Sequence, residues 1–337
     1  MRHLRIALLA LLMVLGLAAF AAACGGDDDG DDTGSEGAPA TKDDVDLTQG
    51  QDVTIAMVTH GDGGSFWAVA KKGAEDGAKQ MGVTLKYSES NNDPQKQAQM
   101  IDAAVTDEVD GLAVSAPNPD AIRDSVQKAV DAGIPVITLN SGAEDFADMG
   151  AMTHVGQTET IAGEGAGAKF KEAGAKKLLC VIHEQANIGL NQRCDGAKTG
   201  FGGEVENFQV KGTDDISTTL TEIQSKLQSD NSIDAVLALN PDIAVAARDA
   251  IKGAGSEAKL ATFDLSGDVV TAIQDGEIEF AVDQQQYLQG YLPIVFLTLN
   301  KSNANTVGGG QPVLTGPGFV TKDNAETVAQ LAKDGTR

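Results

Sequence analysis

The sequence predicts an α/β protein with two lobes, each built around a parallel β-sheet. Short apolar segments alternate with segments of helical period from about residue 51 to the C-terminus, and this alternation is typical of βαβ units. Nearly 290 residues take part, which is long for a single open sheet, so two lobes fit the chain better than one.

Residues 1–23 have the order of a secretory signal. Arg2 and Arg5 precede an uncharged apolar run over residues 6–20, and small alanines follow. The run approaches the ~18 residues of a membrane helix, so an uncleaved anchor is the alternative. The alanines and Cys24 resemble the lipobox of bacterial lipoproteins, although Ala21 stands where Leu is usual. This resemblance implies a lipoprotein signal peptide over 1–23 and an exported protein, lipid-anchored through Cys24 at the outer face of the cell membrane or in the periplasm.

Residues 24–50 are predicted to form a disordered acidic linker, because they hold nine carboxylates, one lysine and no aromatic residue. The segment DDDGDDTGSEG loosely resembles a calcium loop, but it lacks flanking helices and the required carboxylate spacing, so we interpret it as a solvated spacer. The chain carries a net charge of −24, of which −18 belongs to residues 51–337. Nucleic acid is therefore not an expected partner, because its binding needs a basic patch.

Cys180 and Cys194 are the remaining cysteines. If Cys24 is lipidated, they form an even pair in an exported protein, where disulfides persist. We therefore predict a disulfide between Cys180 and Cys194, with two free buried thiols as the alternative.

The folded part begins with four predicted strands and three helices. The strands are VTIAMV, VTLKYS, DGLAVS and IPVITLN, and the helices cover residues 66–81, 95–105 and 120–132. The alternation resumes after about residue 155. Further strands are predicted at KKLLCVIH, FQVKG, IDAVLALN, AKLATFD and IEFAVDQ, with helical segments between them.

In open parallel sheets, ligands bind beyond the carboxyl ends of the strands. The residues at these ends are mainly amides and carboxylates, with one guanidinium and an adjacent aromatic pair. Such a mixture donates and accepts hydrogen bonds and suits a neutral, hydroxyl-rich ligand. The candidate ligand-binding residues are His60, Asp62, Phe66, Trp67, Ser115, Asn140, Gln157, Arg193, Asn240, Asp264 and Gln284. Asn118, His183, Glu184 and Asp283 also follow strands.

Several candidates have a purely structural alternative. Phe66 and Trp67 can cap the first helix against the sheet, and Asn140, Asn240 and Asp264 can act as helix N-caps. Their common position at strand ends on one rim favours a shared site. The chain's histidines fit no zinc spacing, and we expect neither a metal nor another cofactor.

Residues 52–330 resemble type I periplasmic sugar-binding proteins, the ribose- and galactose-binding group of ABC importers. The resemblance is carried, in this order, by FWAVAKKGAEDGAKQMGV, IDAAVTDEVDGLAVSAPNPDAI, AGIPVITLN, RCDGAKTGF, LALNPDIAVAARDAI, TFDLSGDVVTAIQDGEI and DQQQYLQGY. It implies two Rossmann-like lobes with parallel sheets and a three-strand hinge. It also implies a monomer that binds a small sugar or polyol between its lobes and delivers it to an ABC permease. The family's ligand residues fall on Phe66, Trp67, Ser115, Asn140, Arg193, Asn240, Asp264 and Gln284.

The resemblance implies an N-terminal lobe of residues 52–156 and 285–308, and a C-terminal lobe of residues 157–284 and 309–337. Two departures from the family pattern concern the ligand. Asn140 and Ser141 replace the Asp-Arg pair usual in ribose binders, and the second lobe shows no aromatic over residues 188–191. Ribose itself is therefore not the expected ligand.

Other functions are disfavoured or stay open. The chain is not expected to be an enzyme, because it lacks a GxGxxG after the first strand, a phosphate loop and a GxSxG elbow. A transcription repressor of this fold would need a helix-turn-helix before residue 52, where the export signal lies instead. A binding protein that feeds a receptor, or that takes a nucleoside or a small signalling molecule, remains the alternative.

Overall fold

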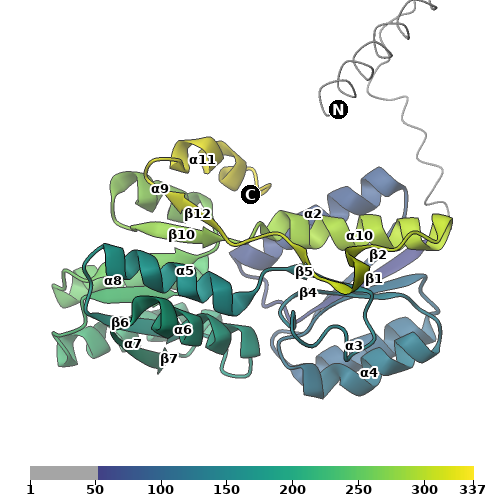
Figure 1. The fold of residues 1–337 in the computed structure, drawn as a ribbon, viewed down its shortest axis with the longest axis horizontal. Coiled ribbons are helices and arrows are strands. Elements are labelled where there is room, and N and C mark those ends of the chain that lie inside the picture. The colour runs from purple at the N-terminus through teal and green to yellow at the C-terminus, as the bar shows by residue number, and fades with distance from the viewer. Residues whose placement is uncertain (1–51) are drawn as a thin grey trace, which may run out of the picture. The chain divides into compact units, whose positions relative to one another are not determined.

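The computed structural model describes residues 52–337, so the predicted signal peptide, the acidic linker and Cys24 lie outside the described residues. Within this range the chain forms two six-stranded sheets with helices packed on both faces of each (Figure 1). The predicted α/β class with two lobes is thereby confirmed. We call the sheet that contains the first strand, with its helices, the first lobe, and the other sheet with its helices the second lobe.

The first lobe is built on a fully parallel sheet in the order β11-β5-β4-β3-β1-β2. Its strands are β1 (Thr54–Thr59), β2 (Thr84–Glu89), β3 (Gly111–Ser115), β4 (Val136–Asn140), β5 (Thr153–Gly156) and β11 (Val313–Leu314). Its helices are α2 (Ser65–Met81), α3 (Pro94–Thr106), α4 (Pro119–Asp131) and α10 (Gln286–Asn303). Helices α2 and α10 cover one face of this sheet, and α3 and α4 cover the other (Figure 1).

The second lobe has the order β12-β10-β9-β8-β6-β7, in which only the edge strand β12 is antiparallel to its neighbour. Its strands are β6 (Lys177–Ile182), β7 (Glu204–Gln209), β8 (Ala235–Ala238), β9 (Lys259–Phe263), β10 (Phe280–Asp283) and β12 (Gly318–Thr321). Its helices are α5 (Glu159–Glu172), α6 (Ile188–Phe201), α7 (Ile216–Ser229), α8 (Pro241–Ala254), α9 (Gly267–Asp275) and α11 (Ala325–Lys333). Two short 3₁₀ turns, η2 (Thr213–Asp215) and η3 (Gly308–Gly310), complete the described elements. Among residues 52–337, no helix is both long and apolar enough to cross a membrane.

The chain passes between the two sheets three times. It leaves the first sheet after Gly156, returns after Asp283, and crosses again between β11 and β12. The third passage lies later than expected, because Val313 and Leu314 pair with β5 and so still belong to the first sheet. The predicted lobe boundary after residue 308 therefore moves to the segment between Leu314 and Gly318.

All nine predicted strands are present, but the prediction missed three further strands. β5, β11 and β12 were not predicted, and β7 begins at Glu204 rather than at Phe208. β7 is an edge strand whose exposed and half-buried residues include two glutamates, so it lacks the apolar run that marks a buried strand. β11 is only two residues long and exists because β5 offers it a partner.

Three helices that follow strand ends begin with the same capping arrangement. Asp93, Asn118 and Asn240 are N-caps whose side-chain oxygens accept hydrogen bonds from backbone N–H groups of the first turn. In each case the next residue is proline, whose fixed φ suits the first helical position. These dipeptides turn the chain at the carboxyl edge of the sheet, which is where the candidate residues lie.

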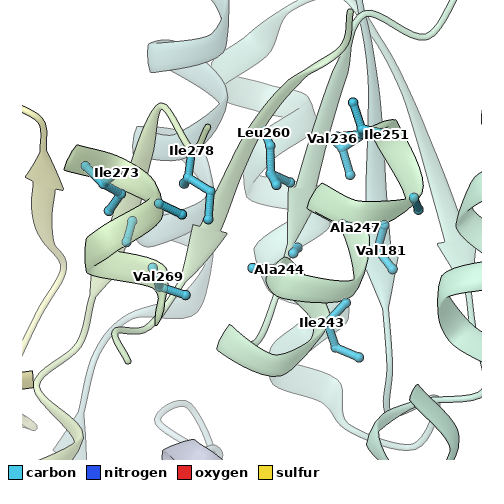
Figure 2. Packing of buried hydrophobic residues seen from close by; sticks show 14 of the residues in the cluster. Val181, Val236, Ile243, Ala244, Ala247, Ile251, Leu260, Val269, Ile273 and Ile278 are labelled. Atoms are coloured by element: carbon cyan, nitrogen blue, oxygen red, sulfur yellow. The ribbon is translucent and has the colours of Figure 1, made fainter. Parts of the chain in front are cut away.

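The core of the second lobe consists of aliphatic side chains from both layers. Figure 2 shows Val181 and Val236 of the sheet facing Ile243 and Ala247 of α8, all of them fully buried. On the opposite face, α5 and α6 pack against the sheet around Phe170. Burying a side chain of this size contributes roughly 1.5–3 kcal/mol.

The predicted disulfide is present and lies within this packing. Cys180 of β6 is bonded to Cys194 of α6, with 5.8 Å between the two Cα atoms, and neither side chain is exposed. The bond ties helix α6 to β6, the strand next to the edge strand β7 of the second sheet.

Two helix pairs touch backbone to backbone because glycines lie at their crossings. A Cβ atom at Gly290 of α10 would lie 1.8 Å from the carbonyl oxygen of Ala70 in α2, and one at Gly73 would lie 2.1 Å from that of Tyr287. The pair α5 and α6 repeats the arrangement, since a Cβ at Gly200 would lie 1.9 Å from the Glu164 carbonyl oxygen. No larger residue fits these positions without separating the helices.

We expect Gly290→Ala to lower the free energy of unfolding by about 1–3 kcal/mol or more, because the added methyl group forces α2 and α10 apart. The matched control is Gly253→Ala in α8, where the nearest atom belongs to the flexible side chain of Gln224 at 3.0 Å. The control should be neutral or slightly stabilising, because alanine favours helix over glycine. Urea denaturation followed by circular dichroism measures both values, and equal effects would contradict the close-packing argument.

Candidate ligand-binding site

Side chains at the carboxyl ends of both sheets line one cavity of about 30 Å³. Strands β1 and β4 and the start of α2 supply its first-lobe wall, which consists of His60, Phe66, Trp67 and Asn140. The second-lobe wall follows β6, β8 and β9 and consists of His183, Glu184, Asn187, Leu190, Arg193, Leu239, Asn240 and Asp264. Gln284, in the second passage between the sheets, completes the lining. The cavity therefore lies between the lobes, at the edges that the strand-end rule identifies.

Arg193 is the positive charge of this cavity and is held by a buried ion pair. Its Nε and Nη2 donate to the two carboxylate oxygens of Glu159 at 2.7 and 2.9 Å, and its Nη1 donates to the Leu239 carbonyl oxygen at 3.1 Å. The guanidinium also lies 4.4 Å from the centre of the Phe263 ring. These contacts use three of its five N–H groups, which leaves one on each terminal nitrogen for a ligand.

Asp264 is the carboxylate at the end of β9, and only 2% of it is exposed. One carboxylate oxygen accepts a hydrogen bond from the Gln284 amide at 2.8 Å. Burial raises the pKa of Asp264 to about 7, although the positive charge of Arg193 opposes the shift. Near neutral pH this carboxyl group is therefore able to donate as well as accept a hydrogen bond.

A chain of amides connects Asp264 to the first lobe. Gln284 donates to Asp264 and accepts a hydrogen bond from the side chain of Gln289 at 2.8 Å. Gln289 in turn accepts one from Asn140 at 3.3 Å. The chain runs through the second passage between the sheets, so it joins the two lining residues of opposite lobes by hydrogen bonds alone.

Asn140 and Asp264 share an uncommon backbone conformation. Their φ angles are +62° and +69°, in the left-handed region that residues other than glycine seldom adopt. Asparagine and aspartate tolerate this region better than other residues, and such conformations occur preferentially at functional sites. Asn140 is the last residue of β4 in the first lobe, and Asp264 directly follows β9 in the second.

His60 is fixed by Ser115 and by the aromatic pair. The Ser115 hydroxyl lies 2.9 Å from the His60 backbone nitrogen and 2.7 Å from its Nδ1. The His60 ring meets Trp67 edge to face at 4.8 Å, and Trp67 meets Phe66 in the same way at 5.0 Å. Phe66 and Trp67 therefore serve the core of the first lobe and line the cavity at once.

Two histidines and Glu184 occupy the outer side of the cavity. The Glu184 carboxylate lies 3.7 Å from Nε2 of His60 and 3.9 Å from Nε2 of His183, and it accepts a hydrogen bond from Asn187 at 2.7 Å. Burial lowers the pKa of both histidines, so their rings are neutral at pH 7. Neutral imidazole offers one donor and one acceptor, which suits hydroxyl groups.

Direct hydrogen bonds join the rims of the two lobes around the cavity. The Ile188 backbone N–H donates to the Pro117 carbonyl oxygen at 3.0 Å, and the Ser141 hydroxyl donates to the Asn187 side chain at 3.3 Å. At another point of the rim, Asp242 of α8 accepts a hydrogen bond from the backbone of Ser65, at the N-terminus of α2, at 3.1 Å. A carboxylate is favoured there by the helix dipole. The lobes are therefore in contact, with the cavity enclosed between them.

Most of the predicted site residues meet at this cavity, and three do not line it. Asp62 accepts hydrogen bonds from the Gly64 backbone and from the Thr213 hydroxyl of the second lobe, so it lies at the rim. Ser115 lies behind His60. Gln157 donates to Glu159 at 2.9 Å and thus supports the partner of Arg193. Asn240 lines the cavity and also caps α8, so it has both the site position and the N-cap role that the sequence suggests.

Several lining residues were not among the predicted set. The strand-end rule identified His183 and Glu184, but they were not included in the predicted ligand-binding set. Leu190 lies within residues 188–191, where the sequence shows no aromatic. Nothing in the sequence marks Glu159 as a partner of Arg193, because glutamate is common in the first turn of a helix. Within residues 52–337, no group of three or more potential metal-ligating side chains converges.

Comparison with known proteins gives consistent matches. Residues 55–299 match the sequence profile of a family described as periplasmic binding protein domain. A crystal structure of a carbohydrate transporter from Acidothermus cellulolyticus, solved in complex with myo-inositol, is 43% identical in sequence. The match covers 85% of this chain and 99% of that one, with a TM-score of 0.83.

Curated relatives are more distant. The fructose import binding protein of Bifidobacterium longum is 29% identical over 245 residues, which cover 68% of this chain and 74% of that protein. The ribose import binding protein of Bacillus subtilis is 28% identical over 238 residues, which cover 67% and 74%.

The raised pKa of Asp264 predicts a pH effect on stability. Between about pH 4 and 7 the folded protein holds a proton on Asp264 that the unfolded chain loses, so its contribution to stability falls as pH rises through this window. Asp264→Asn removes this contribution. We expect the variant to gain a few kcal/mol relative to the unmodified protein between pH 4 and 7, at about 1.4 kcal/mol per pKa unit. Urea denaturation across this range, with the exposed Asp268→Asn as control, measures the difference, and a constant difference would contradict the assignment.

Proposed function

This chain belongs to the periplasmic binding protein family, and we propose from this that it binds a small sugar or polyol between its lobes outside the cytoplasm and delivers it to an ABC importer. The observation that carries the proposal is the interlobe cavity at the strand ends, which combines amides, carboxylates, one guanidinium and a tryptophan. The two curated relatives are named as a fructose and a ribose import binding protein, and neither name is that of an enzyme.

The lining fits a neutral, hydroxylated ring. Arg193 retains two free N–H groups, Asp264 offers a carboxylate oxygen, and Asn240 and Asn140 of opposite walls offer amide N–H groups. Each of these groups forms a hydrogen bond to a hydroxyl group, and those with charged partners are the strong ones. Trp67 supplies an apolar face for the C–H side of the ring. The only full positive charge in the lining is neutralised by Glu159, so the site does not favour an anionic ligand.

Capture and release follow from movement of the lobes. A cavity of about 30 Å³ has room for about two water molecules, so a sugar reaches it only when the lobes separate about the three passages between the sheets. A ligand that contacts both walls favours the closed arrangement by its higher affinity for that state. In this proposal the closed, loaded form is what the permease recognises.

A similar solved structure and the departures at Asn140 and Ser141 narrow the choice of ligand. The Acidothermus cellulolyticus structure holds myo-inositol, which makes a six-membered polyol ring the first candidate for this chain. Ser141 uses its hydroxyl for Asn140 and for Asn187 of the other lobe, so it does not replace the arginine of ribose binders as a ligand donor. We therefore expect that the ligand is not ribose.

A thermal-shift screen of myo-inositol, hexoses, pentoses and other polyols tests the proposal. The true ligand should raise the melting temperature, because it binds only the folded protein, and should change the fluorescence of Trp67, the one tryptophan of the chain. Asp264→Ala should lower its affinity by about 2 kcal/mol, because buried donors lose their partner, while the exposed Asp268→Ala should leave it unchanged. If no member of the panel shifts either signal, the proposed function is wrong.

We further propose that the protein is held at the membrane through a lipidated Cys24, on the strength of the signal order in residues 1–23. Two or more acyl chains give stable anchoring, whereas the mature chain without them is released. Expressed in a lipoprotein-processing bacterium, the protein should therefore partition with membranes, and Cys24→Ser should abolish this partition. Labelling with a radioactive fatty acid reports the same step, and equal labelling of both proteins would refute the anchor.

A further inference from the structure

The disulfide between Cys180 and Cys194 closes a loop that carries most of the second-lobe wall. The two cysteines are 14 residues apart in the sequence, and the loop between them runs from β6 into the second turn of α6. We call residues 180–194 the cystine loop. Of the eight side chains that form the second-lobe wall, five lie in this loop: His183, Glu184, Asn187, Leu190 and Arg193.

The bond lies in the core of the second lobe, close to these side chains in the sequence. Cys194 directly follows Arg193, and Cys180 precedes His183 by three residues. Neither cysteine side chain is exposed, and both belong to the apolar cluster between the second sheet and helices α5 and α6. The bond therefore depends on the packing of the second lobe alone, and it stays in place whatever the position of the first lobe.

Between β6 and α6, residues 183–187 form a turn without regular secondary structure. Within the turn, the Asn187 backbone N–H donates to the Glu184 carbonyl oxygen at 3.2 Å, and the Asn187 side chain donates to the Glu184 carboxylate at 2.7 Å. The Asn187 side-chain oxygen also accepts a hydrogen bond from the Gly189 backbone at 3.0 Å, which caps α6. These contacts join neighbours in the sequence, so they do not fix the turn to the rest of the second lobe.

The first lobe supplies further contacts to the same segment. The Ile188 backbone N–H donates to the Pro117 carbonyl oxygen at 3.0 Å, and the Ser141 hydroxyl donates to the Asn187 side chain at 3.3 Å. Both hydrogen bonds cross from lobe to lobe, so both are lost when the lobes separate to admit a ligand. In that open arrangement the disulfide still joins α6 to β6, and the wall residues of the cystine loop depend on it more than they do in the closed arrangement.

We propose that the disulfide between Cys180 and Cys194 positions the second-lobe wall for ligand binding, because it keeps this wall formed while the lobes are apart. This inference rests on the proposed function, since the wall is part of the same interlobe site. A loop that is already ordered loses little conformational freedom at the moment of binding, so its affinity for the ligand is higher. A disulfide with a purely structural role would change the stability of the protein but not the affinity of its folded form.

The informative variant is Cys180→Val/Cys194→Ala, which replaces the bond by apolar side chains, since a buried cysteine packs like a small apolar residue. The matched control is Leu227→Ala, at a buried position in the last turn of α7 that does not line the cavity. It also lowers stability, but it leaves the cystine loop intact. Amide hydrogen exchange without ligand, followed by mass spectrometry, reports the order of residues 183–193. Titration calorimetry with myo-inositol, and then with the other members of the thermal-shift panel, reports affinity. Sucrose is added to all samples, because it favours the folded state of both variants.

We expect residues 183–193 to exchange faster in the disulfide variant than in the unmodified protein, and Leu227→Ala to leave their exchange no faster than that of the rest of the second lobe. The affinity should fall about tenfold or more in the disulfide variant, because its loop becomes ordered only on binding. It should stay within about twofold in the control, because distant sites act independently. Unchanged exchange of the loop, or an equal loss of affinity in both variants, overturns this inference alone. If no member of the panel binds the unmodified protein, the proposed function itself fails, whereas the exchange measurement still reports whether the disulfide orders the loop.

Discussion

The buried ion pair of Arg193 and Glu159 is the interaction on which the site depends. Only 4% of the arginine side chain and 1% of the glutamate side chain are exposed, so removing either one would leave an uncompensated charge in the interior. The pair joins the first turn of α5 to α6, two helices whose glycines already bring their backbones into contact. The neighbouring Cys194 binds α6 to β6. The second-lobe wall is therefore held rigid by its own contacts.

The passages between the sheets belong to the same network. Gln289 donates to the Gln284 side chain at 2.8 Å and to the Thr315 hydroxyl at 3.2 Å, and the Thr315 backbone donates to the Gly156 carbonyl oxygen at 2.7 Å. All three passages are thus linked by hydrogen bonds close to the cavity. Because Gln284 also contacts Asp264 and Gln289 contacts Asn140, a change in the angle between the lobes moves ligand groups on both walls together. The side chains that link the passages are therefore in contact with residues that line the cavity.

The charge pattern explains why a chain of net charge −24 has a site suited to a neutral ligand. The guanidinium of Arg193 is neutralised by Glu159, the two histidines are uncharged because burial lowers their pKa, and Asp264 carries a proton part of the time near pH 7 because burial raises its pKa. Glu184 remains on the outer side of the cavity. Ser141 donates a hydrogen bond to Asn187 of the second lobe and so connects the lobes.

The sequence by itself determined the α/β alternation, the nine principal strands, the disulfide pair and most of the cavity lining. These features depend on the local hydrophobic period, on the number of cysteines and on the general rule that the carboxyl ends of parallel strands gather at one edge. The tertiary structure alone decided that Glu159 pairs with Arg193, that Ser115 and Gln157 support lining residues instead of lining the cavity, and that Val313 and Leu314 complete the first sheet. It also decided the size of the cavity. The physical reason is that a side chain's partner is chosen by which element packs beside it, and these partners lie 34 residues apart for Arg193 and Glu159 and 55 for Ser115 and His60.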